Sequence, residues 1–230
     1  MKITAVMAEL RRLADPAVVA GMARFGVPSD NALGVSAPKL RALARKIGQD
    51  QELSLELWQT GVLEARAIAA LIGEPKKVTR RQMNRWASEF DSWSVCDACC
   101  CLLFVFTPFA LEMAFKWATS KREFVKRAGF VLMAASAVHL KELTDREFLP
   151  MLDAVRLAAT DDRNFVKKAV SWALRQIGKR NRKLNALAIK EAMRIRKTDS
   201  RTARWIAADA LRELQSSGVE RRFRKWERKS

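Results

Sequence analysis

Asp97 is the carboxylate with the most unusual setting in the chain, within the stretch FDSWSVCDACCCLLF (Phe90–Phe104). It lies four residues after Trp93, at the edge of an apolar run that predicts a helix. Residues four apart on a helix share a face, so the carboxylate and the indole are presented together. A carboxylate can stabilise developing positive charge, and an indole can contact a cation or a flat ring.

The rest of this segment predicts a separate apolar stripe. Its members follow three- and four-residue spacing: Val95, Cys99, Leu102, Leu103 and Phe106. Trp93 and Asp97 fall on a second face, with Cys101 and Phe104. Two interpretations of Asp97 stay open from spacing alone: it caps a neighbouring helix or pairs with a buried arginine, or it has a functional role on this face.

Arg127 presents a similar choice. The segment Ser120–Val138 is apolar almost all round after this residue, which predicts a buried helix. A buried guanidinium needs a carboxylate or a phosphate as partner. Asp97 is the simple internal partner, and a phosphate is the functional one.

Trp172 falls off the apolar stripe of the segment Asp161–Asn181. Its neighbours at helical spacing are Lys168, Arg175 and Lys179. A tryptophan among cations suits a surface that meets a nucleic-acid strand or a cationic base. Four other tryptophans are expected as core or edge anchors: Trp58, Trp86, Trp117 and Trp226.

All four cysteines lie close together, at Cys96, Cys99, Cys100 and Cys101. A zinc site usually takes two spaced pairs of ligands, and the chain has only the distant His139 besides this cluster. We therefore predict buried free thiols that act as small apolar side chains.

Helices are expected to position all these residues. The 230 residues include nine glycines and no sustained period-two alternation, so the sequence predicts an all-α protein. Capping residues mark the helix starts: Asp15, Ser36, Thr79, Ser92, Thr107, Ser120, Asp145, Asp161 and Ser200. Tandem short helices, repeating as pairs of about 40 residues, favour an α-solenoid of HEAT-like repeats with a basic concave face.

One domain is expected for residues 1–230, because no Gly-, Pro- or Ser-rich linker divides the chain. The end RRFRKWERKS (Arg221–Ser230) predicts either an ordered helix or a basic tail. No apolar run approaches the ~18 residues that span a membrane, and the start lacks a secretory pattern. A cytoplasmic protein is the expectation, associated with the nucleoid if the source is bacterial.

The net charge of +18 points to an acidic partner, and nucleic acid is the favoured one because binding phosphates releases counterions. Residues 161–230 hold 21 lysines and arginines against 8 acidic residues. A solvated face or a basic tail is the alternative. Phosphate-binding glycine motifs, His-based hydrolase chemistry and two-metal catalysis are disfavoured, since their residue patterns are absent from the sequence.

Four segments resemble the AlkD family of DNA alkylation repair proteins, which are HEAT-like-repeat DNA glycosylases. They are GVSAPKLRALARKIG, FDSWSVCD, EFVKRAGF and RNFVKKAVSWALRQIGKRN, and the similarity spans about residues 30–215. Matching motif to motif, the resemblance places cleft residues at Trp93, Asp97, Arg127 and Trp172.

The resemblance implies hydrolytic removal of N3- or N7-alkylated purines from duplex DNA, without a metal or redox cofactor. A monomer is expected, because solenoids of this size are commonly monomeric. It implies that Asp97 is catalytic together with Trp93, Trp172 and Arg127. Six further cations are expected to contact DNA: Lys126, Lys168, Arg175, Lys179, Arg180 and Arg204.

One residue departs from the family pattern. Many glycosylase members have an acidic residue directly after the first tryptophan, where this chain has Ser94. Two alternatives to the glycosylase therefore stay open. One is a catalytically inactive DNA-binding protein that recognises distorted or branched DNA, and the other is a protein-interaction solenoid.

Overall fold

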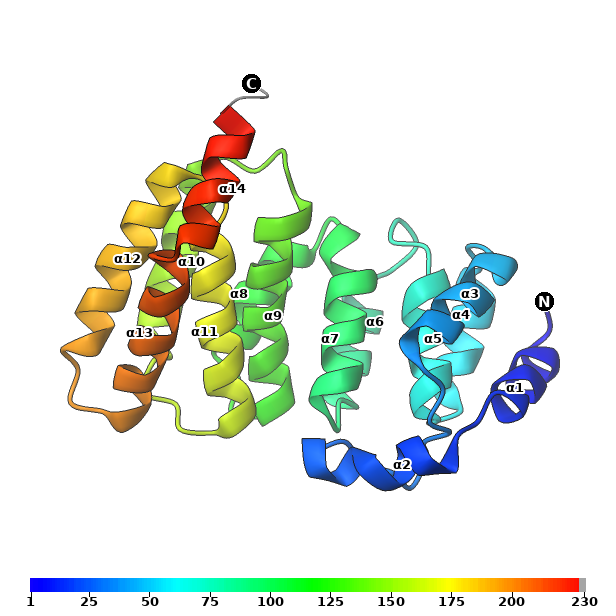
Figure 1. The fold of residues 1–230 in the computed structure, drawn as a ribbon. Helices are drawn as coiled ribbons and strands as arrows, with labels where there is room; N and C mark the ends of the chain where they lie inside the picture. Colours follow the sequence, from blue (N-terminus) through cyan, green and yellow to red (C-terminus); the bar gives the residue numbers. More distant parts are fainter. Residues whose placement is uncertain (228–230) are drawn as a thin grey trace. The chain divides into compact units, whose positions relative to one another are not determined.

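The computed structural model describes residues 1–227, and within them it contains 14 α-helices, two 3-10 helices and no strand. The predicted all-α class is confirmed (Figure 1). Contacts between residues divide the chain into two compact units, Met1–Phe109 and Ala110–Ser230. The expectation of one domain, and of a basic concave face along it, stays a prediction. No helix in the described part of the chain is long and apolar enough to cross a membrane.

Helix α5 is the centre of the first unit, because it packs against α3, α4 and α7, and α1 packs against α4 and α5. Trp58 of α4 stacks on Trp86 of α6, with ring centroids 4.0 Å apart, so both are core residues as predicted. The elements of this unit are α1 (Ile3–Arg12), α2 (Pro16–Met22), η1 (Ala23–Phe25), α3 (Ala37–Ile47), α4 (Gln51–Gln59), α5 (Leu63–Ile72), α6 (Arg80–Ser88), α7 (Trp93–Leu102) and η2 (Phe104–Phe106).

A buried carboxylate holds the loop that enters α3. Glu64 of α5 accepts hydrogen bonds from the backbone N–H groups of Leu33 (2.8 Å), Gly34 (2.7 Å) and Val35 (3.3 Å). Gly34 has a φ of 75°, and a Cβ there would lie 2.2 Å from the carbonyl oxygen of Asp15. The loop therefore depends on glycine at this position.

The second unit is built in two layers. Helix α11 packs against α9 and α13 in one layer, and α10 packs against α8 and α12 in the other (Figure 1). Its helices are α8 (Ala110–Ala118), α9 (Glu123–His139), α10 (Asp145–Leu157), α11 (Asn164–Gly178), α12 (Arg182–Arg196), α13 (Arg201–Leu214) and α14 (Ser217–Glu227).

Polar contacts reveal the repeat that is weak in the sequence. In the second unit, side chains bond to groups 38 residues along the chain, as from Arg127 to Phe165 and from Ser171 to Asp209. In the first unit the corresponding offset is 31 residues, as from Trp58 to Glu89. The expected spacing of about 40 residues therefore describes the second unit and overestimates the first.

Most predicted helix starts agree with the structure. Asp15, Thr79 and Ser200 accept hydrogen bonds from the first turns of α2, α6 and α13, and Ser36 and Ser92 hold the N-cap positions of α3 and α7. Asp145 was predicted as the N-cap of α10, but it is the first residue of the helix, and Thr144 holds the N-cap position.

Three predicted starts are wrong by two residues, because each capping side chain bonds within a turn that precedes the helix. The Thr107 hydroxyl donates to the Phe104 carbonyl, the Ser120 hydroxyl accepts from the Arg122 N–H, and Asp161 accepts from the Arg163 N–H. Helices α8, α9 and α11 begin only after these turns.

Helix α7 ends at Leu102, and η2 follows after Leu103. This change turns Phe106 outward, where it is 46% exposed, so its place in the apolar stripe was wrong. Cys96, Cys99 and Cys100 are buried free thiols, as predicted, whereas Cys101 is half-buried. Burial raises the pKa of both Cys99 and Cys100 well above the ordinary thiol value.

The basic end is ordered as α14 up to Glu227, which favours the helix over the tail for that part. Residues 228–230 of the predicted tail lie outside the described residues.

We expect Gly129→Ala to destabilise the protein by about 1–3 kcal/mol, because α8 and α9 approach closely at this glycine. A Cβ on Gly129 would lie 2.5 Å from the Ala118 nitrogen and 2.8 Å from the Ala114 carbonyl oxygen. Gly21→Ala is the matched control, since a Cβ there meets nothing within 4 Å and alanine favours a helix. Equal melting temperatures of the two variants would contradict the close approach.

Candidate nucleic-acid interface

Trp93 and Asp97 lie one turn apart on α7 of the first unit, and both side chains are half-buried. Val95 and Cys99 of the same helix are buried in the core. The core stripe therefore fixes the rotation of α7, and the Trp93–Asp97 face is the one that reaches solvent.

The Trp93 ring is oriented by a residue that is distant in the sequence. Its Nε1–H donates a 2.8 Å hydrogen bond to the carbonyl oxygen of Phe25, the last residue of η1. Gly26 follows in the left-handed conformation and turns the chain there. The indole edge is thus fixed, while the Phe25 side chain itself is 68% exposed beside it. Sequence reasoning missed Phe25, because no local pattern signals a contact across 68 residues.

Arg127 lies on α9 of the second unit and is only 6% exposed. One terminal nitrogen of its guanidinium donates a 2.7 Å hydrogen bond to the Phe165 carbonyl oxygen, in the first turn of α11. The ring of Phe165 lies 5.4 Å from the Phe124 ring, centroid to centroid. Arg127 therefore joins the two helices whose neighbouring faces carry the candidate residues of this unit.

A second polar contact joins the beginnings of the same two helices. Asp161, in the connection before α11, pairs with Lys126 of α9 at 2.9 Å and with both forks of the Arg163 guanidinium. Arg163 also donates to the Lys121 carbonyl oxygen at 2.7 Å. The Arg163 guanidinium, assisted by Lys126, holds the pKa of the Asp161 carboxyl well below its usual range.

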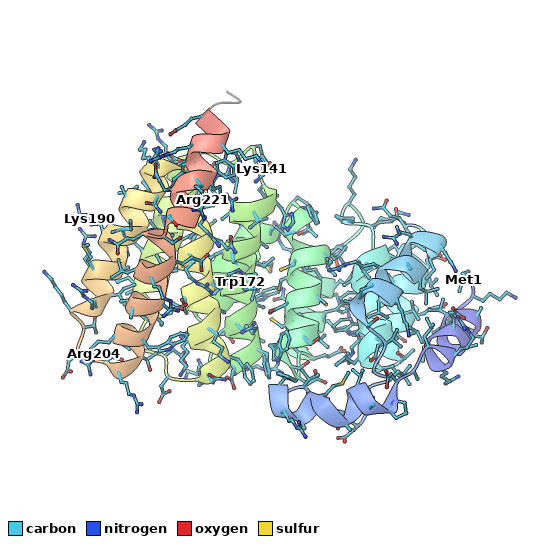
Figure 2. All side chains as sticks on the ribbon, in the orientation of Figure 1. Met1, Lys141, Trp172, Lys190, Arg204 and Arg221 are labelled. Atoms are coloured by element: carbon cyan, nitrogen blue, oxygen red, sulfur yellow. The ribbon has the colours of Figure 1, made fainter. Side chains whose placement is uncertain are left out.

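Trp172 is half-buried two turns into α11, and Figure 2 labels it there. Its neighbours Arg175 and Lys179 both form ion pairs with carboxylates of the protein. Arg175 pairs with Asp209 at 3.4 Å and with Glu213, and Lys179 pairs with Glu213 as well. These carboxylates belong to α13, so the same bonds hold α11 against it.

The other predicted DNA-binding cations differ in how they are used. Arg180 is half-buried and donates to three backbone carbonyls, at Ala137, Lys141 and Leu143. Arg204 is 55% exposed and bonds to the exposed Asp199 at 3.2 Å. The Lys168 side chain is exposed and has no hydrogen bond or ion pair with any described residue.

The structure therefore brings the candidates together as two pairs, each within its own unit. Trp93 and Asp97 share one face of α7, and Arg127 and Trp172 lie on the packed helices α9 and α11. In residues 1–227, no three His, Cys, Asp or Glu side chains gather in a way that could hold a metal ion.

Comparisons with known proteins agree with this architecture. A family model described as "DNA alkylation repair enzyme" matches residues 6–214. A solved structure described as "A new family of proteins related to the HEAT-like repeat DNA glycosylases with affinity for branched DNA structures" superposes with a TM-score of 0.76 and 20% identity, covering 93% of this chain and 96% of that one. The predicted HEAT-like repeat fold is thereby confirmed. No curated protein matches the sequence.

We expect Asp161→Asn to lower the melting temperature at neutral pH, with a cost of about 2 kcal/mol, because two cations lose their shared carboxylate. The folded state lowers the pKa of Asp161, so its stabilisation is full above the unfolded pKa of about 4 and is lost progressively as the pH falls from there through the lower folded pKa. The variant should accordingly lose less stability than the parent between neutral pH and about pH 3.

Asp162→Asn is the matched control, because this neighbouring carboxylate is exposed. Thermal unfolding followed by circular dichroism across this pH range measures both effects. Parallel pH profiles for the parent and Asp161→Asn would contradict the role of the carboxylate.

Proposed function

The chain belongs to the DNA alkylation repair enzyme family, and from this premise we propose that it is a DNA glycosylase that excises cationic N3- or N7-alkylated purines from duplex DNA. The observation that carries the proposal is the placement of Asp97 and Trp93 on the solvent-reaching face of α7. The indole of this pair is held in place by a backbone carbonyl.

Cleavage of the glycosidic bond needs little assistance from the protein, because the alkylated base is already a good leaving group. An alkyl group on N3 or N7 gives the purine a positive charge. When the C1′–N9 bond breaks, its electron pair neutralises the base, and positive charge develops on the sugar. Water then forms the new bond to C1′ and gives up a proton.

Asp97 supplies what this reaction needs. Its carboxylate stabilises the oxocarbenium-like charge on the sugar and accepts the proton of the attacking water. Because α7 is fixed by its core stripe, the carboxylate is presented without a loop rearrangement. Trp93 contacts the cationic base or its sugar through the face of its ring.

The second unit contributes contacts to the strand that carries the lesion. The predicted contact of Trp172 with the lesion or its sugar stays a prediction, and of the cations near it Lys168 is the exposed one. The predicted role of Arg127, holding a backbone phosphate, requires its guanidinium to reach the surface. With 6% exposure and a bond to Phe165, its first role is to position α11 against α9. A direct phosphate contact stays a prediction.

A second candidate function is DNA binding without catalysis. The similar solved structure is described as having affinity for branched DNA, and Ser94 occupies the position where many glycosylases carry an acidic residue. In either function the chain is expected to associate with DNA as a monomer.

We expect Asp97→Asn to reduce release of 7-methylguanine from methylated duplex DNA at least about a hundredfold, since removing a group that stabilises transition-state charge costs this much. Binding of the undamaged duplex should stay unchanged. Asp91→Asn is the matched control, because it removes an exposed carboxylate just before α7.

The result separates the two functions. Equal release by the parent and Asp97→Asn would contradict the catalytic role of Asp97. If the parent releases no base yet binds the duplex, the protein belongs to the non-catalytic DNA-binding members, and its affinity for a four-way junction then becomes the informative measurement.

A further prediction compares two lysines whose settings differ. Lys168→Gln should weaken duplex binding and reduce the dependence of log affinity on log salt by about one, because it removes one exposed cation. Lys126→Gln should lower the melting temperature instead, since Lys126 is 18% exposed and paired with Asp161. Salt titrations of binding and thermal unfolding of both variants test this, and the reverse assignment would contradict it.

A further inference from the structure

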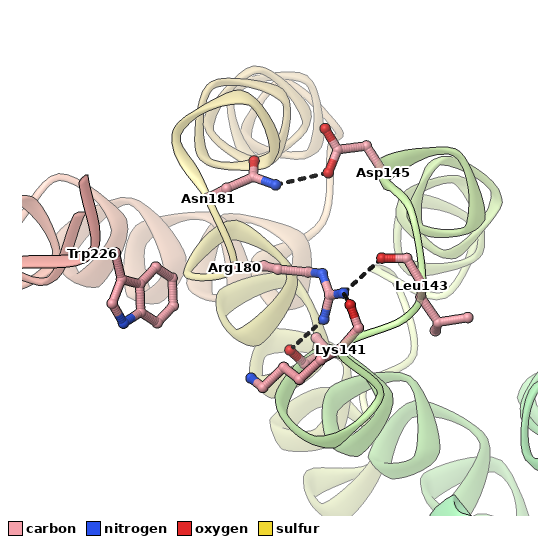
Figure 3. A pocket seen from close by; sticks show the side chains of 7 residues that line it. Lys141, Leu143, Asp145, Arg180, Asn181 and Trp226 are labelled. Atoms are coloured by element: carbon pink, nitrogen blue, oxygen red, sulfur yellow. Dashed lines mark hydrogen bonds between the residues drawn. The ribbon is translucent and has the colours of Figure 1, made fainter. Parts of the chain in front are cut away.

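A pocket of about 420 Å³ opens where α14 passes the ends of α9 and α11, and none of the residues that line it is assigned to base release. Figure 3 shows Lys141 and Arg180 on one side of it and Trp226 on the other. Asp145 and Asn181 also line it. All of these residues belong to the second unit.

Arg180 gives the pocket a fixed positive charge. Its guanidinium donates to the carbonyl oxygens of Ala137 (3.2 Å), Lys141 (3.0 Å) and Leu143 (2.6 Å), and its carbon lies 4.7 Å from the centre of the Phe148 ring. These contacts prevent the side chain from moving into solvent. A cation held in this way is preorganised for an anion that enters the pocket.

A second cation lines the pocket, and a third lies beside its tryptophan. Lys141 is exposed at the rim, and its pKa is lowered by partial burial and by the neighbouring charges of Arg180 and Arg222. The Arg222 guanidinium lies over the Trp226 ring, 4.4 Å from its centre. Like charges gathered at one pocket repel each other, and an anion placed among them relieves that repulsion.

Asp145, the acidic side chain that lines the pocket, already has a hydrogen bond and an ion pair. Asp145 accepts a 2.7 Å hydrogen bond from the Asn181 side chain and lies 3.8 Å from the Lys183 ammonium. Its charge is therefore shared with partners on α12 and its cap. Among the residues that line the pocket, the two cations Lys141 and Arg180 outnumber this one carboxylate.

Trp226 supplies a flat apolar surface beside these charges. It is 37% exposed, and Arg222 covers its ring from one direction. An indole next to a cationic groove is the combination that binds single-stranded nucleic acid, where the bases stack and the phosphates pair with cations. A base in intact duplex cannot stack on a side chain in this way, because it is already stacked and paired.

We propose that this pocket binds one unpaired nucleotide of DNA, with its phosphate among Lys141, Arg180 and Arg222 and its base against Trp226. The inference rests on the proposed function in taking DNA as the polymer. It adds a second contact site on the protein, which recognises a single-stranded end or branch next to the duplex.

The test compares the affinity for a blunt duplex with that for the same duplex carrying an unpaired tail of about ten nucleotides, measured by fluorescence polarisation. We expect the tail to raise affinity at least about tenfold, as stacking of one or two bases would. Trp226→Ala and Lys141→Gln should remove most of this gain. Lys190→Gln, which removes an exposed cation on α12, should keep it.

Two additions make the result specific. Trp226→Phe keeps an aromatic face and should retain part of the gain, which separates stacking from any unfolding of α14. An abasic tail offers phosphates alone, so the parent and Trp226→Ala should bind it equally. If the abasic tail gives the full gain, the pocket binds phosphate only and the nucleotide assignment falls.

The failure of this inference differs from the failure of the proposed function. A tail that adds no affinity, or a gain that survives both pocket variants, overturns the inference while base release stands. A tail-dependent gain without any release of 7-methylguanine upholds the inference and overturns the glycosylase. If neither the tail nor the blunt duplex is bound, both fall.

Discussion

A buried guanidinium must be hydrogen-bonded where it lies, and in the second unit this requirement determines how α11 packs on α9. Arg127 is almost fully buried, and one of its hydrogen bonds goes to the Phe165 carbonyl in the first turn of α11. The Asp161 carboxylate then joins the same two helices through Lys126. Together these contacts set the register of α11, and the register places Trp172.

Several other cations of the second unit are also used in contacts within the protein. Arg175 and Lys179 neutralise carboxylates on α13, and Arg180 binds three carbonyls at the end of α9. A net charge of +18 therefore overstates the number of cations that can meet phosphates directly. In the proposed function, duplex affinity is expected from exposed residues such as Lys168, whereas the paired cations join neighbouring helices.

Local patterns explain what the sequence could predict. The four-residue spacing of Trp93 and Asp97, and the side-chain caps at Asp15 and Thr79, depend only on neighbours along one helix. The predictions failed where a side chain bonds within a preceding turn, as Thr107 does. They were also silent on contacts between distant segments, since nothing near Trp93 indicates the Phe25 carbonyl.

The pocket at α14 could be predicted from the sequence only in part. Arg222 and Trp226 are four residues apart, so their stacking follows from helical spacing once α14 is recognised as a helix. Their meeting with Lys141 and Arg180 depends on tertiary packing, which no spacing rule provides. The interpretation of the basic end of the chain thus differs between the sequence and the structure. As a sequence it is a run of charge, and as α14 it contributes Trp226 to the pocket for which we propose an unpaired nucleotide as ligand.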